Sequence, residues 1–340
     1  MTAWRELPKV ELHCHLLGVI RPALLESIRR ESGPILVTPE ALAGAYPVCG
    51  LPVFQQWLEI LRPYQCANAE AMRPILAAHV SDLIAQRVVY AEIMLSPSMF
   101  PRERGAMLDA FHRWRAWTFE LEQGKIQIEF LLVVPRTLDA GRLEHDQAMC
   151  LELRREGLIV GVALVGVETG ESIARFTQAF HAWRDAGLGI EIHAGEHSES
   201  GSVRDAIENG HPHRLGHGLS AFHDLALLDS IRANQIHIEF CPTSNLCTGA
   251  VASIGQHPIG MAKTQGLSFS LNTDDPGTFD CSMESEYETV AQAFGFGPAD
   301  FMEVFRQSLA ARFEPRLRYL ASVPSIKNPR KQIPAINETH

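Results

Sequence analysis

The amino-acid sequence indicates an α/β protein that forms one (β/α)₈ barrel over residues 1–340, with extra helices near the first strand and at the carboxyl terminus. Short apolar runs of strand character alternate with helical stretches eight times. Such alternation implies a parallel sheet, and eight units fit a closed barrel. No linker, low-complexity stretch or internal repeat interrupts the pattern, and no turn carries G-x-G-x-x-G or G-x-x-x-x-G-K. The missing glycine motifs argue against the runner-up architecture, a doubly wound open sheet.

The strands are predicted from apolar residues at every second position. In the first strand, Val10 and Leu12 face one way, whereas Glu11, His13 and His15 face the other. The first seven strands are expected at residues 10–16, 88–95, 126–134, 158–165, 188–193, 214–217 and 237–240.

The eighth strand begins at residue 268 and ends in two adjacent acids, Asp274 and Asp275. Phe269 and Leu271 form an apolar face that suits packing against helices. The alternate positions are small or polar, as expected for the inside of a barrel near a site. Pro276 holds the preceding residue extended and stops the strand.

Helices are expected between these strands, wherever apolar residues recur at helical spacing. They cover residues 21–30, 39–64, 70–86, 104–122, 142–156, 171–186, 203–208, 222–233 and 258–265, with a last group from 283 to about 319 and a loosely ordered tail after 322. The stretch 39–64 lies between the first two strands and carries Phe54, Trp57, Leu58 and Leu61 at helical spacing. Two interpretations stay open for it: a helical lid over residues 39–66, or a plain packing helix.

Composition excludes several functional classes. A net charge of −10, without runs of Lys or Arg, argues against a nucleic-acid surface and is compatible with a small-molecule substrate. The longest apolar runs are too short to span a bilayer, and the amino terminus has no apolar signal core. Seven scattered cysteines without C-x-x-C favour reduced thiols and a cytoplasmic protein. No feature of the sequence indicates an oligomeric state.

Histidines and acids occur at the carboxyl ends of the predicted strands, where such barrels carry their chemistry. They are His13 and His15 on strand one, His193 and Glu196 on strand five, His217 on strand six, and Asp274 and Asp275 on strand eight. Four inward polar groups at four strand ends are hard to explain as core packing.

A metal site is the first interpretation of this set. His13 and His15 share one face of their strand, about 6.6 Å apart, so that both imidazoles can reach one ion. His193 has the same inward parity, and Asp274 adds a carboxylate. Three imidazoles and one carboxylate suit Zn²⁺, although iron, cobalt or manganese also fit.

A metal with this donor set lowers the pKa of water and so provides a nucleophile near neutral pH. A hydrolytic site also needs groups that move protons. His217 and Asp275 are candidates for accepting the proton of the water, and Glu196 is the candidate for protonating the substrate. A carboxyl group acts as an acid near pH 7 when burial raises its pKa. The alternative for each of the three is a structural polar group.

Five motifs together resemble the adenosine deaminase family of the amidohydrolases, in the order that the family has them. They are His13-Cys14-His15, His193-Ala194-Gly195-Glu196, Arg214-Leu215-Gly216-His217-Gly218, Cys241-Pro242-Thr243-Ser244-Asn245 and Asn272-Thr273-Asp274-Asp275-Pro276. The matching positions run from residue 8 to residue 287, which is nearly the whole chain. The combination is highly specific, although no single motif is.

The resemblance implies one zinc ion per chain on His13, His15, His193 and Asp274. It implies that Glu196 protonates N1 of a 6-aminopurine while water attacks C6, releasing ammonia and a 6-oxopurine. His217 and Asp275 would orient and deprotonate the water, and the backbone N–H of Gly166 would meet the purine. Binuclear amidohydrolases usually carry a bridging lysine on the fourth strand, and residues 158–165 contain none. The H-x-E…P-C-x-x-C signature of cytidine-type deaminases is also missing.

Some positions depart from the family pattern. Leu17 replaces the acid that contacts the ribose 5′-hydroxyl in adenosine deaminases, and an apolar group there disfavours a polar 5′ position. Met94 stands where the family commonly has an arginine, and Ala163 replaces a common acid. Phe54 and Leu58 match the apolar helix that covers the substrate in the family.

The leading function hypothesis is zinc-dependent deamination of a 6-aminopurine nucleoside, with adenosine or deoxyadenosine as the default substrate. The second keeps the chemistry but changes the substrate to a 5′-deoxy or 5′-methylthio adenosine, free adenine or another amino-heterocycle. The third is an inactive barrel that binds a purine or a protein partner. Such a barrel should have lost a metal ligand or Glu196, and the sequence retains all of them.

Overall fold

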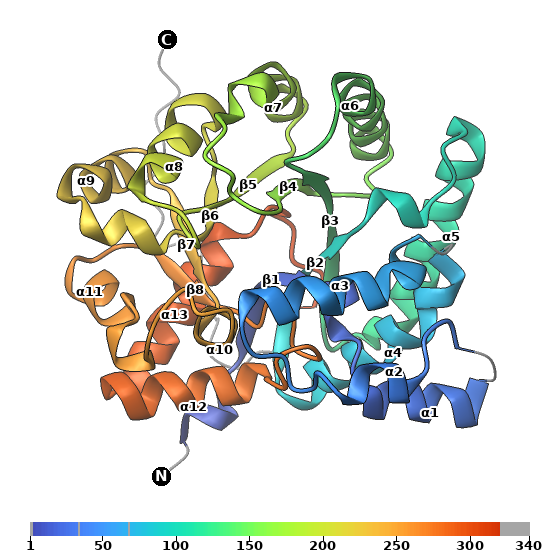
Figure 1. Ribbon diagram of the computed structural model, residues 1–340, viewed down its shortest axis with the longest axis horizontal. Helices are drawn as coiled ribbons and strands as arrows, with labels where there is room; N and C mark the ends of the chain where they lie inside the picture. The colour runs from blue at the N-terminus through green and yellow to red at the C-terminus, as the bar shows by residue number, and fades with distance from the viewer. Residues whose placement is uncertain (1–2, 33–34, 67–68, 320–340) are drawn as a thin grey trace.

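The computed structural model describes residues 3–32, 35–66 and 69–319. Eight parallel strands follow one another around a barrel in the order β1 to β8, with helices outside them (Figure 1). The strands are β1 Lys9–His15, β2 Val88–Leu95, β3 Gln127–Pro135, β4 Gly161–Val165, β5 Gly189–Ala194, β6 Arg214–His217, β7 His237–Phe240 and β8 Phe269–Leu271. The predicted (β/α)₈ barrel is therefore confirmed.

The barrel closes between β1 and β8, next to the predicted metal ligands. His15 N donates to Asp274 O at 2.8 Å, and Asp274 N donates to His13 O at 2.9 Å. Nearer the amino-terminal end of these strands, the side-chain oxygen of Asn272 accepts a hydrogen bond from Leu12 N at 3.0 Å. The ladder ends at Leu271, so Asp274 lies beyond the strand, in an isolated bridge with Cys14. The predicted eighth strand is too long for this reason.

Helices lie outside the barrel between successive strands. They are α1 Pro22–Ser32, α2 Pro39–Ala43, α3 Leu51–Gln65, α4 Ala69–Ala85, α5 Arg104–Glu122, α6 Ala140–Arg155, α7 Thr177–Asp185, α8 Ser200–Asp205, α9 Leu225–Ala233, α10 Pro242–Cys247, α11 Ile259–Thr264, α12 Met283–Phe294 and α13 Pro298–Ala311. Shorter 3₁₀ turns are η1 Ala3–Glu6, η2 Leu16–Val19, η3 Pro97–Met99, η4 Ile173–Phe176, η6 Leu219–His223 and η7 Ile254–Gln256, and η5 Ala206–Gly210 is a π-helical turn.

Several predicted helix boundaries are wrong. The stretch 39–64 is two helices, because Pro47 has no N–H to donate and Gly50 adopts a φ of 91°. The helix expected from residue 222 begins at Leu225, where the side chain of Asp224 caps it by accepting from Ala226 N. The helix expected from 171 begins at Thr177 after a 3₁₀ turn.

Two further differences concern the end of the chain and the β7–β8 connection. The short helix α10 was not predicted. The last helix ends at Ala311, so the structure has no helix over residues 312–319. The tail after residue 322 lies outside the described residues.

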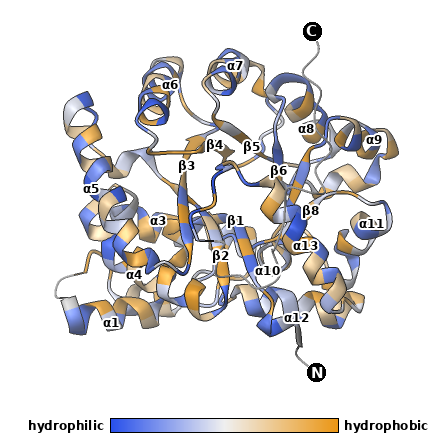
Figure 2. Ribbon diagram, turned by 180° about the vertical axis from the view of Figure 1, so that it is seen from behind, coloured by the Kyte–Doolittle hydropathy of each residue, from blue (hydrophilic) through white to orange (hydrophobic). Residues whose placement is uncertain are grey.

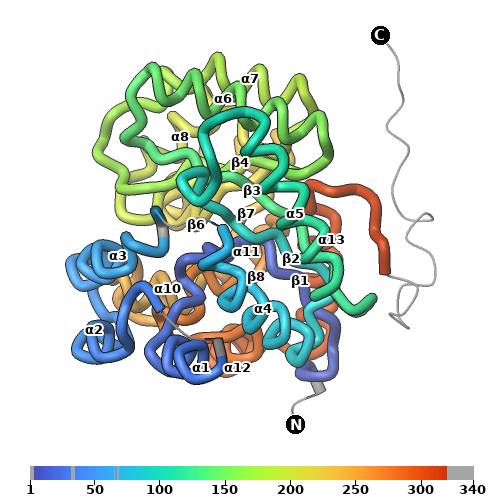
Figure 3. The backbone as a smooth tube through the Cα atoms, turned by 90° about the vertical axis from the view of Figure 1, so that its right-hand side faces the viewer, coloured from blue at the N-terminus to red at the C-terminus, as the bar shows by residue number. Residues whose placement is uncertain are grey.

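The two ends of the barrel differ. Helices α2 and α3 project over the end at which the strands terminate, and residues 312–319 run across the opposite end (Figure 3). Seen from behind, the strands carry hydrophilic as well as hydrophobic segments (Figure 2). Within the described helices, no segment combines the length and apolarity that crossing a membrane requires.

The inside of the barrel has two halves. Met94, Leu131, Val133, Val160 and Ala163 form an apolar cluster contributed by β2, β3, β4 and the residue before β4. The other half contains fully buried charged and polar groups, namely Glu11, His13, Glu191, Arg214, His217 and Glu239. Glu92 of β2 and Glu129 of β3 are buried as well, so the division holds toward the carboxyl ends of the strands: chemistry is expected there on the β1 and β5–β8 side, and apolar contacts on the β2–β4 side.

Candidate metal centre and active site

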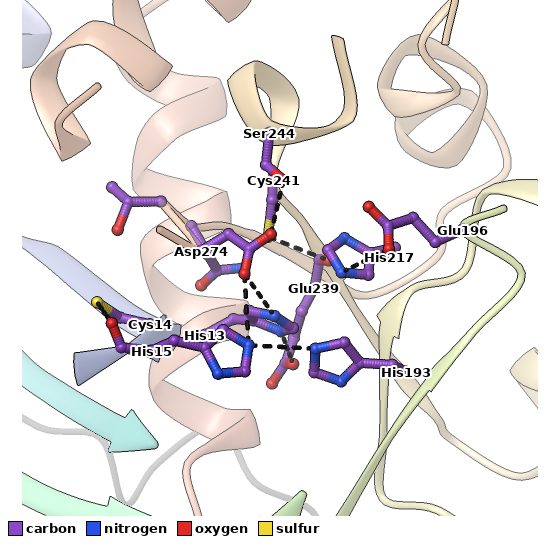
Figure 4. A network of polar contacts seen from close by, with 12 residues as sticks. His13, Cys14, His15, His193, Glu196, His217, Glu239, Cys241, Ser244 and Asp274 are labelled. Atoms are coloured by element: carbon purple, nitrogen blue, oxygen red, sulfur yellow. Dashed lines mark hydrogen bonds and ion pairs between the residues drawn. The ribbon is translucent and has the colours of Figure 1, made fainter. Parts of the chain in front are cut away.

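The four predicted metal ligands converge at the carboxyl end of the barrel (Figure 4). His15 Nε2 lies 3.3 Å from His193 Nε2. Asp274 Oδ1 lies 3.4 Å from His15 Nε2 and 3.5 Å from His13 Nε2. His13 Nε2 is buried and has no hydrogen-bond partner among the described residues. Three imidazole nitrogens and one carboxylate oxygen thus face one point.

The electrostatics of His15, His193 and Asp274 suit a cation, whereas the pKa of His13, which burial would lower, is raised well above its usual value by Glu191 and Asp274. Burial lowers the pKa of His15 to about 3, and burial with the neighbouring His13 lowers the pKa of His193 to about 4, so both rings are neutral. Burial would raise the pKa of Asp274, but the neighbouring His13 holds it well below its usual value. Neutral imidazoles and an ionised carboxylate are the forms that ligate metals. The donor set fits Zn²⁺.

A cysteine also lies beside this set. Cys241 is close enough to His13 and Asp274 to share an ion with them. Burial, together with Asp274, raises the pKa of its thiol well above the usual value. A protonated thiol is a weak ligand, so Asp274 is the better fourth donor.

Two buried carboxylates lie behind the histidines, and sequence reasoning missed both. Glu239 Oε2 is 2.9 Å from His13 Nδ1, and Glu191 Oε1 is 2.9 Å from His193 Nδ1. A carboxylate on Nδ1 fixes the ring and leaves Nε2 for the metal. The signal was present in the sequence, because Glu191 precedes His193 by two residues and therefore shares its inward face.

A third missed residue, Arg214, balances this charge. Its guanidinium lies 2.5 Å from Glu239 Oε1 and 2.6 Å from Glu92 Oε2, with all three side chains buried. Burial would raise the pKa of Glu239, but Arg214 and His13 lower it to about 2. The support for the ligands is thus a continuous chain of ion pairs.

The predicted acid–base groups lie beside the metal ligands. Glu196 follows β5, and its Oε2 is 3.6 Å from Nε2 of His217. Burial would raise the pKa of Glu196, but His217 and His197 lower it to about 2. Glu196 is therefore an anion in the resting site, and it must gain a proton before it can donate one.

Asn245 determines which nitrogen of His217 is protonated. Its Nδ2 is 3.1 Å from His217 Nδ1 and 3.4 Å from Glu196 Oε1, and its Oδ1 faces His257 Nε2 at 3.1 Å. The amide nitrogen only donates, so His217 Nδ1 accepts. Neutral His217 then carries its proton on Nε2, the nitrogen that faces Glu196.

Asp275 lies against Gly18, the residue after Leu17. A Cβ on Gly18 would lie 1.7 Å from Asp275 Oδ1, so no larger residue fits there. Burial and the adjacent Asp274 raise the pKa of Asp275 well above its usual value. Asp274 and His217 also adopt φ of 60° and 65°. Such strained backbone concentrates at functional sites.

A cavity of about 330 Å³ opens above these groups, and all of the predicted substrate-binding positions line it. Its floor includes His15, His193, Glu196, His217, Asp274 and Asp275. Its remaining wall is mostly apolar, with Leu17, Phe54, Leu58, Met72, Met94, Met99, Val133 and Val165, and it includes Gly166. Ala163 lies below, in the apolar cluster of the barrel interior. A cavity of this size suits a small organic molecule.

The chain is similar to known deaminases over nearly its whole length. The family model described as adenosine deaminase matches residues 8–322. An adenine deaminase from Sinorhizobium fredii is 32% identical over 335 residues, covering 95% of this chain and 99% of the relative. An adenosine deaminase from Shewanella loihica is 30% identical over 318 residues, covering 90% of this chain and 94% of the relative.

Solved structures show the same fold. The N6-methyl-AMP deaminase from Arabidopsis thaliana superposes with a TM-score of 0.79 at 25% identity, covering 96% of this chain and all of that one (100%). An amidohydrolase from Burkhoderia ambifaria, with bound Zn, superposes with a TM-score of 0.73 at 23% identity, covering 92% of this chain and 87% of that one. This chain belongs to the adenosine deaminase family, the adenine and adenosine deaminases that hydrolyse C–N bonds.

Proposed function

We propose that this protein is a zinc-dependent hydrolase that removes the amino group of a 6-aminopurine. The observation that carries the proposal is the convergence of His13, His15, His193 and Asp274 beneath one cavity, whose floor includes Glu196, His217 and Asp275. One Zn²⁺ per chain is proposed, since the B. ambifaria amidohydrolase is described with bound Zn. An inactive barrel is disfavoured because no ligand or acid–base group is missing.

Each side chain has a separate task in the proposed reaction. When bound, the metal acts as a Lewis acid that makes water nucleophilic near neutral pH. Asp275 is proposed to accept the proton of that water once it is itself ionised, because neutral His217 holds its own proton on Nε2 and can only donate there. His217 orients the oxygen, and Glu196, which takes up a proton as the substrate binds, delivers that proton to N1 as C6 is attacked. The proton held by Asp275 passes to the amino group, the C6–N bond breaks, and the C6 hydroxyl proton returns to Glu196, leaving ammonia and a 6-oxopurine.

We propose that the purine lies between two loops. Glu196 on one side and the backbone N–H of Gly166 on the other are proposed to meet its ring nitrogens, since both line the cavity. Helix α3 brings Phe54 and Leu58 to the cavity wall, and we propose that region 39–66 covers the substrate. The barrel and this helical region would together form a single domain over residues 1–340.

The rest of the substrate is proposed to be apolar or absent rather than a ribose with a free 5′-hydroxyl. Leu17, Phe54, Leu58 and Met94 line the cavity, and an unpaired hydroxyl against them would lose its hydrogen bond to water. Free adenine is one candidate, because the S. fredii relative is named adenine deaminase. A 5′-deoxy or 5′-methylthio adenosine is the other candidate, because its apolar 5′ group would pack against the apolar side chains of the cavity wall.

Ultraviolet loss of the adenine band tests both statements. Purified protein with its zinc content measured is mixed with adenine, adenosine, 2′-deoxyadenosine and 5′-methylthioadenosine. We expect turnover, with kcat/KM for adenine or 5′-methylthioadenosine at least about tenfold above that for adenosine, since one lost hydrogen bond is worth about 1.4 kcal/mol. A preference for adenosine would overturn the substrate assignment. No turnover of any 6-aminopurine by zinc-loaded protein would overturn the reaction itself.

A further inference from the structure

A carboxylate outside the predicted site collects an unusual number of hydrogen bonds. Glu168, on the loop after β4, accepts from the backbone N–H of three consecutive residues: Gly195 at 2.7 Å, Glu196 at 2.9 Å and His197 at 3.3 Å. Two hydroxyls, those of Ser198 at 2.5 Å and of Ser202, also donate to it. One side chain thus accepts from the whole loop that carries Glu196.

These bonds keep Glu168 charged. Burial would raise its pKa, but the hydroxyls of Ser198 and Ser202 and the backbone N–H groups of Gly195 and Glu196 lower it below the usual value. No cation forms an ion pair with Glu168 within 4 Å among the described residues. The N–H and hydroxyl groups of the loop after β5 therefore form an anion-binding site, and the Glu168 carboxylate on the loop after β4 occupies it.

The loop that carries Glu196 is closely packed on the side away from Glu168. Gly195 adopts a φ of 73°, and a Cβ there would lie 2.4 Å from Ser220 Oγ and 2.5 Å from Val203 Cγ2. Residues 195–198 are thus held between Glu168 on one side and η6 and α8 on the other. The bond to Glu196 N fixes the backbone from which the catalytic carboxylate projects toward His217.

We propose that Glu168 is a positioning residue for the proton donor. It joins the loop of Gly166, which meets the purine, to the loop of Glu196, which protonates it, and so sets the distance between N1 and the Glu196 carboxylate. The statement that Glu196 transfers a proton to N1 rests on the proposed function. The positioning of the loop does not, because it rests on the hydrogen bonds alone.

Two other roles make different predictions. If Glu168 bound the substrate directly, since it also lines the cavity, its loss would raise KM. If it were only a structural brace, its loss would lower the melting temperature without changing kcat below that temperature. A positioning residue changes kcat while KM and zinc content stay constant.

The test compares Glu168→Gln with Glu171→Gln in the zinc-loaded, full-length protein. The amide NH₂ that Glu168→Gln introduces cannot accept hydrogen bonds, so part of the five-donor set loses its acceptor. Glu171 lies on the same loop, is exposed and forms no hydrogen bond or ion pair with the described residues, so it serves as the matched control. Readouts are zinc content, kcat and KM, and amide hydrogen exchange of residues 195–203 measured by mass spectrometry.

For Glu168→Gln we expect kcat to fall about 100-fold, as a misplaced catalytic group does, with KM within about threefold of wild type. Exchange of residues 195–203 should rise about tenfold or more, the effect of losing charge-assisted bonds. Glu171→Gln should match wild type in every readout. Unchanged kcat and exchange in Glu168→Gln would refute the proposal, and so would a rise in KM at constant kcat.

Failure of the proposed function gives a different result. If the wild-type protein turned over no 6-aminopurine, the exchange measurement would still report whether Glu168 holds the loop. Increased exchange with full activity would show that the loop is held but that its position does not matter for proton transfer, and it would overturn the proposal.

Discussion

At the scale of single residues, the proposed metal ligands and the proposed proton donor are held by different contacts. His13 and His193 are held by buried carboxylates behind them, whereas Glu196 depends on a hydrogen-bonded loop. Metal binding and proton transfer should therefore fail separately when residues are changed.

Glu196→Gln should fold and bind zinc like the wild type, but its kcat should fall at least about 10³-fold, because the amide cannot carry the proton to N1. Zinc analysis and steady-state kinetics measure the two effects. Glu199→Gln, an exposed acid on the same loop, is the control and should keep full activity. Glu196→Gln with wild-type turnover would refute the acid assignment.

Leu17→Glu should shift substrate preference toward adenosine. The new carboxylate would lie on the wall of the cavity, where it can accept from a ribose hydroxyl. We expect kcat/KM for adenosine to rise about tenfold, and that for 5′-methylthioadenosine to fall, since a hydrogen bond of this kind contributes about 1.5 kcal/mol. Leu17→Met preserves the apolar wall and should leave the ranking unchanged. The same ranking in Leu17→Glu would mean that position 17 does not select the substrate.

At the scale of elements, a buried acid links α12 to α10. Glu286 on α12 accepts from Thr243 N, in the first turn of α10, at 3.1 Å, and its Oε1 has no partner among the described residues. Burial raises its pKa to about 7, although the hydrogen bonds from Thr243 oppose this. The packing of α10, which carries Ser244 and Asn245, therefore depends on a group that titrates near neutral pH.

Glu286 should make stability fall as pH rises. Its native pKa of about 7 exceeds the ordinary 4.5, so the folded state binds the proton more tightly than the unfolded chain. The resulting stabilisation is complete below about pH 4.5 and is lost as pH rises through about 7. The free energy of unfolding of Glu286→Gln should therefore rise relative to that of the wild type across this pH window, by at most about 3 kcal/mol. Denaturant unfolding at several pH values measures it. Glu288→Gln, a half-exposed acid on the same helix, should show no such trend.

At the scale of the whole molecule, a chain of contacts joins the two ends of the barrel. Phe313 N, in the segment that follows the last helix, donates to Glu92 Oε1 at 2.7 Å. Glu92 pairs with Arg214, Arg214 pairs with Glu239, and Glu239 holds His13. The carboxyl-terminal segment is therefore connected to His13, a proposed metal ligand, from the opposite end of the barrel.

Arg214→Met should weaken both the fold and the metal site. It leaves Glu92 and Glu239 buried without their cation, which costs about 3–5 kcal/mol. It also frees the carboxylate that orients His13, for which a loss of zinc affinity of about 10- to 100-fold is expected. Denaturant unfolding and competition with a zinc chelator measure the two effects. Arg232→Met, whose exposed pair with Asp229 contributes little, is the control. If Arg214→Met folds and binds zinc as tightly as the wild type, this ion-pair network does not support the metal site.

Local pattern in the sequence was enough to predict the barrel and the residues that face its centre. Side chains alternate along a strand, and the carboxyl ends of parallel strands meet at one edge, so His13, His193 and Asp274 had to approach one another once eight strands were recognised. Leu17, Phe54, Leu58 and Gly166 were placed through the family resemblance, and each lines the cavity.

The partners of those residues depend on the folded chain. Glu239 meets His13 across 226 positions, and Glu168 meets Glu196 across 28. Nothing local distinguishes these acids from other buried or surface acids. The same holds for the direction of the Glu196 pKa, because burial and the charge of His217 act in opposite directions and their balance depends on distance. A strand's alternation specifies which way a side chain points, but long-range packing specifies what it meets there.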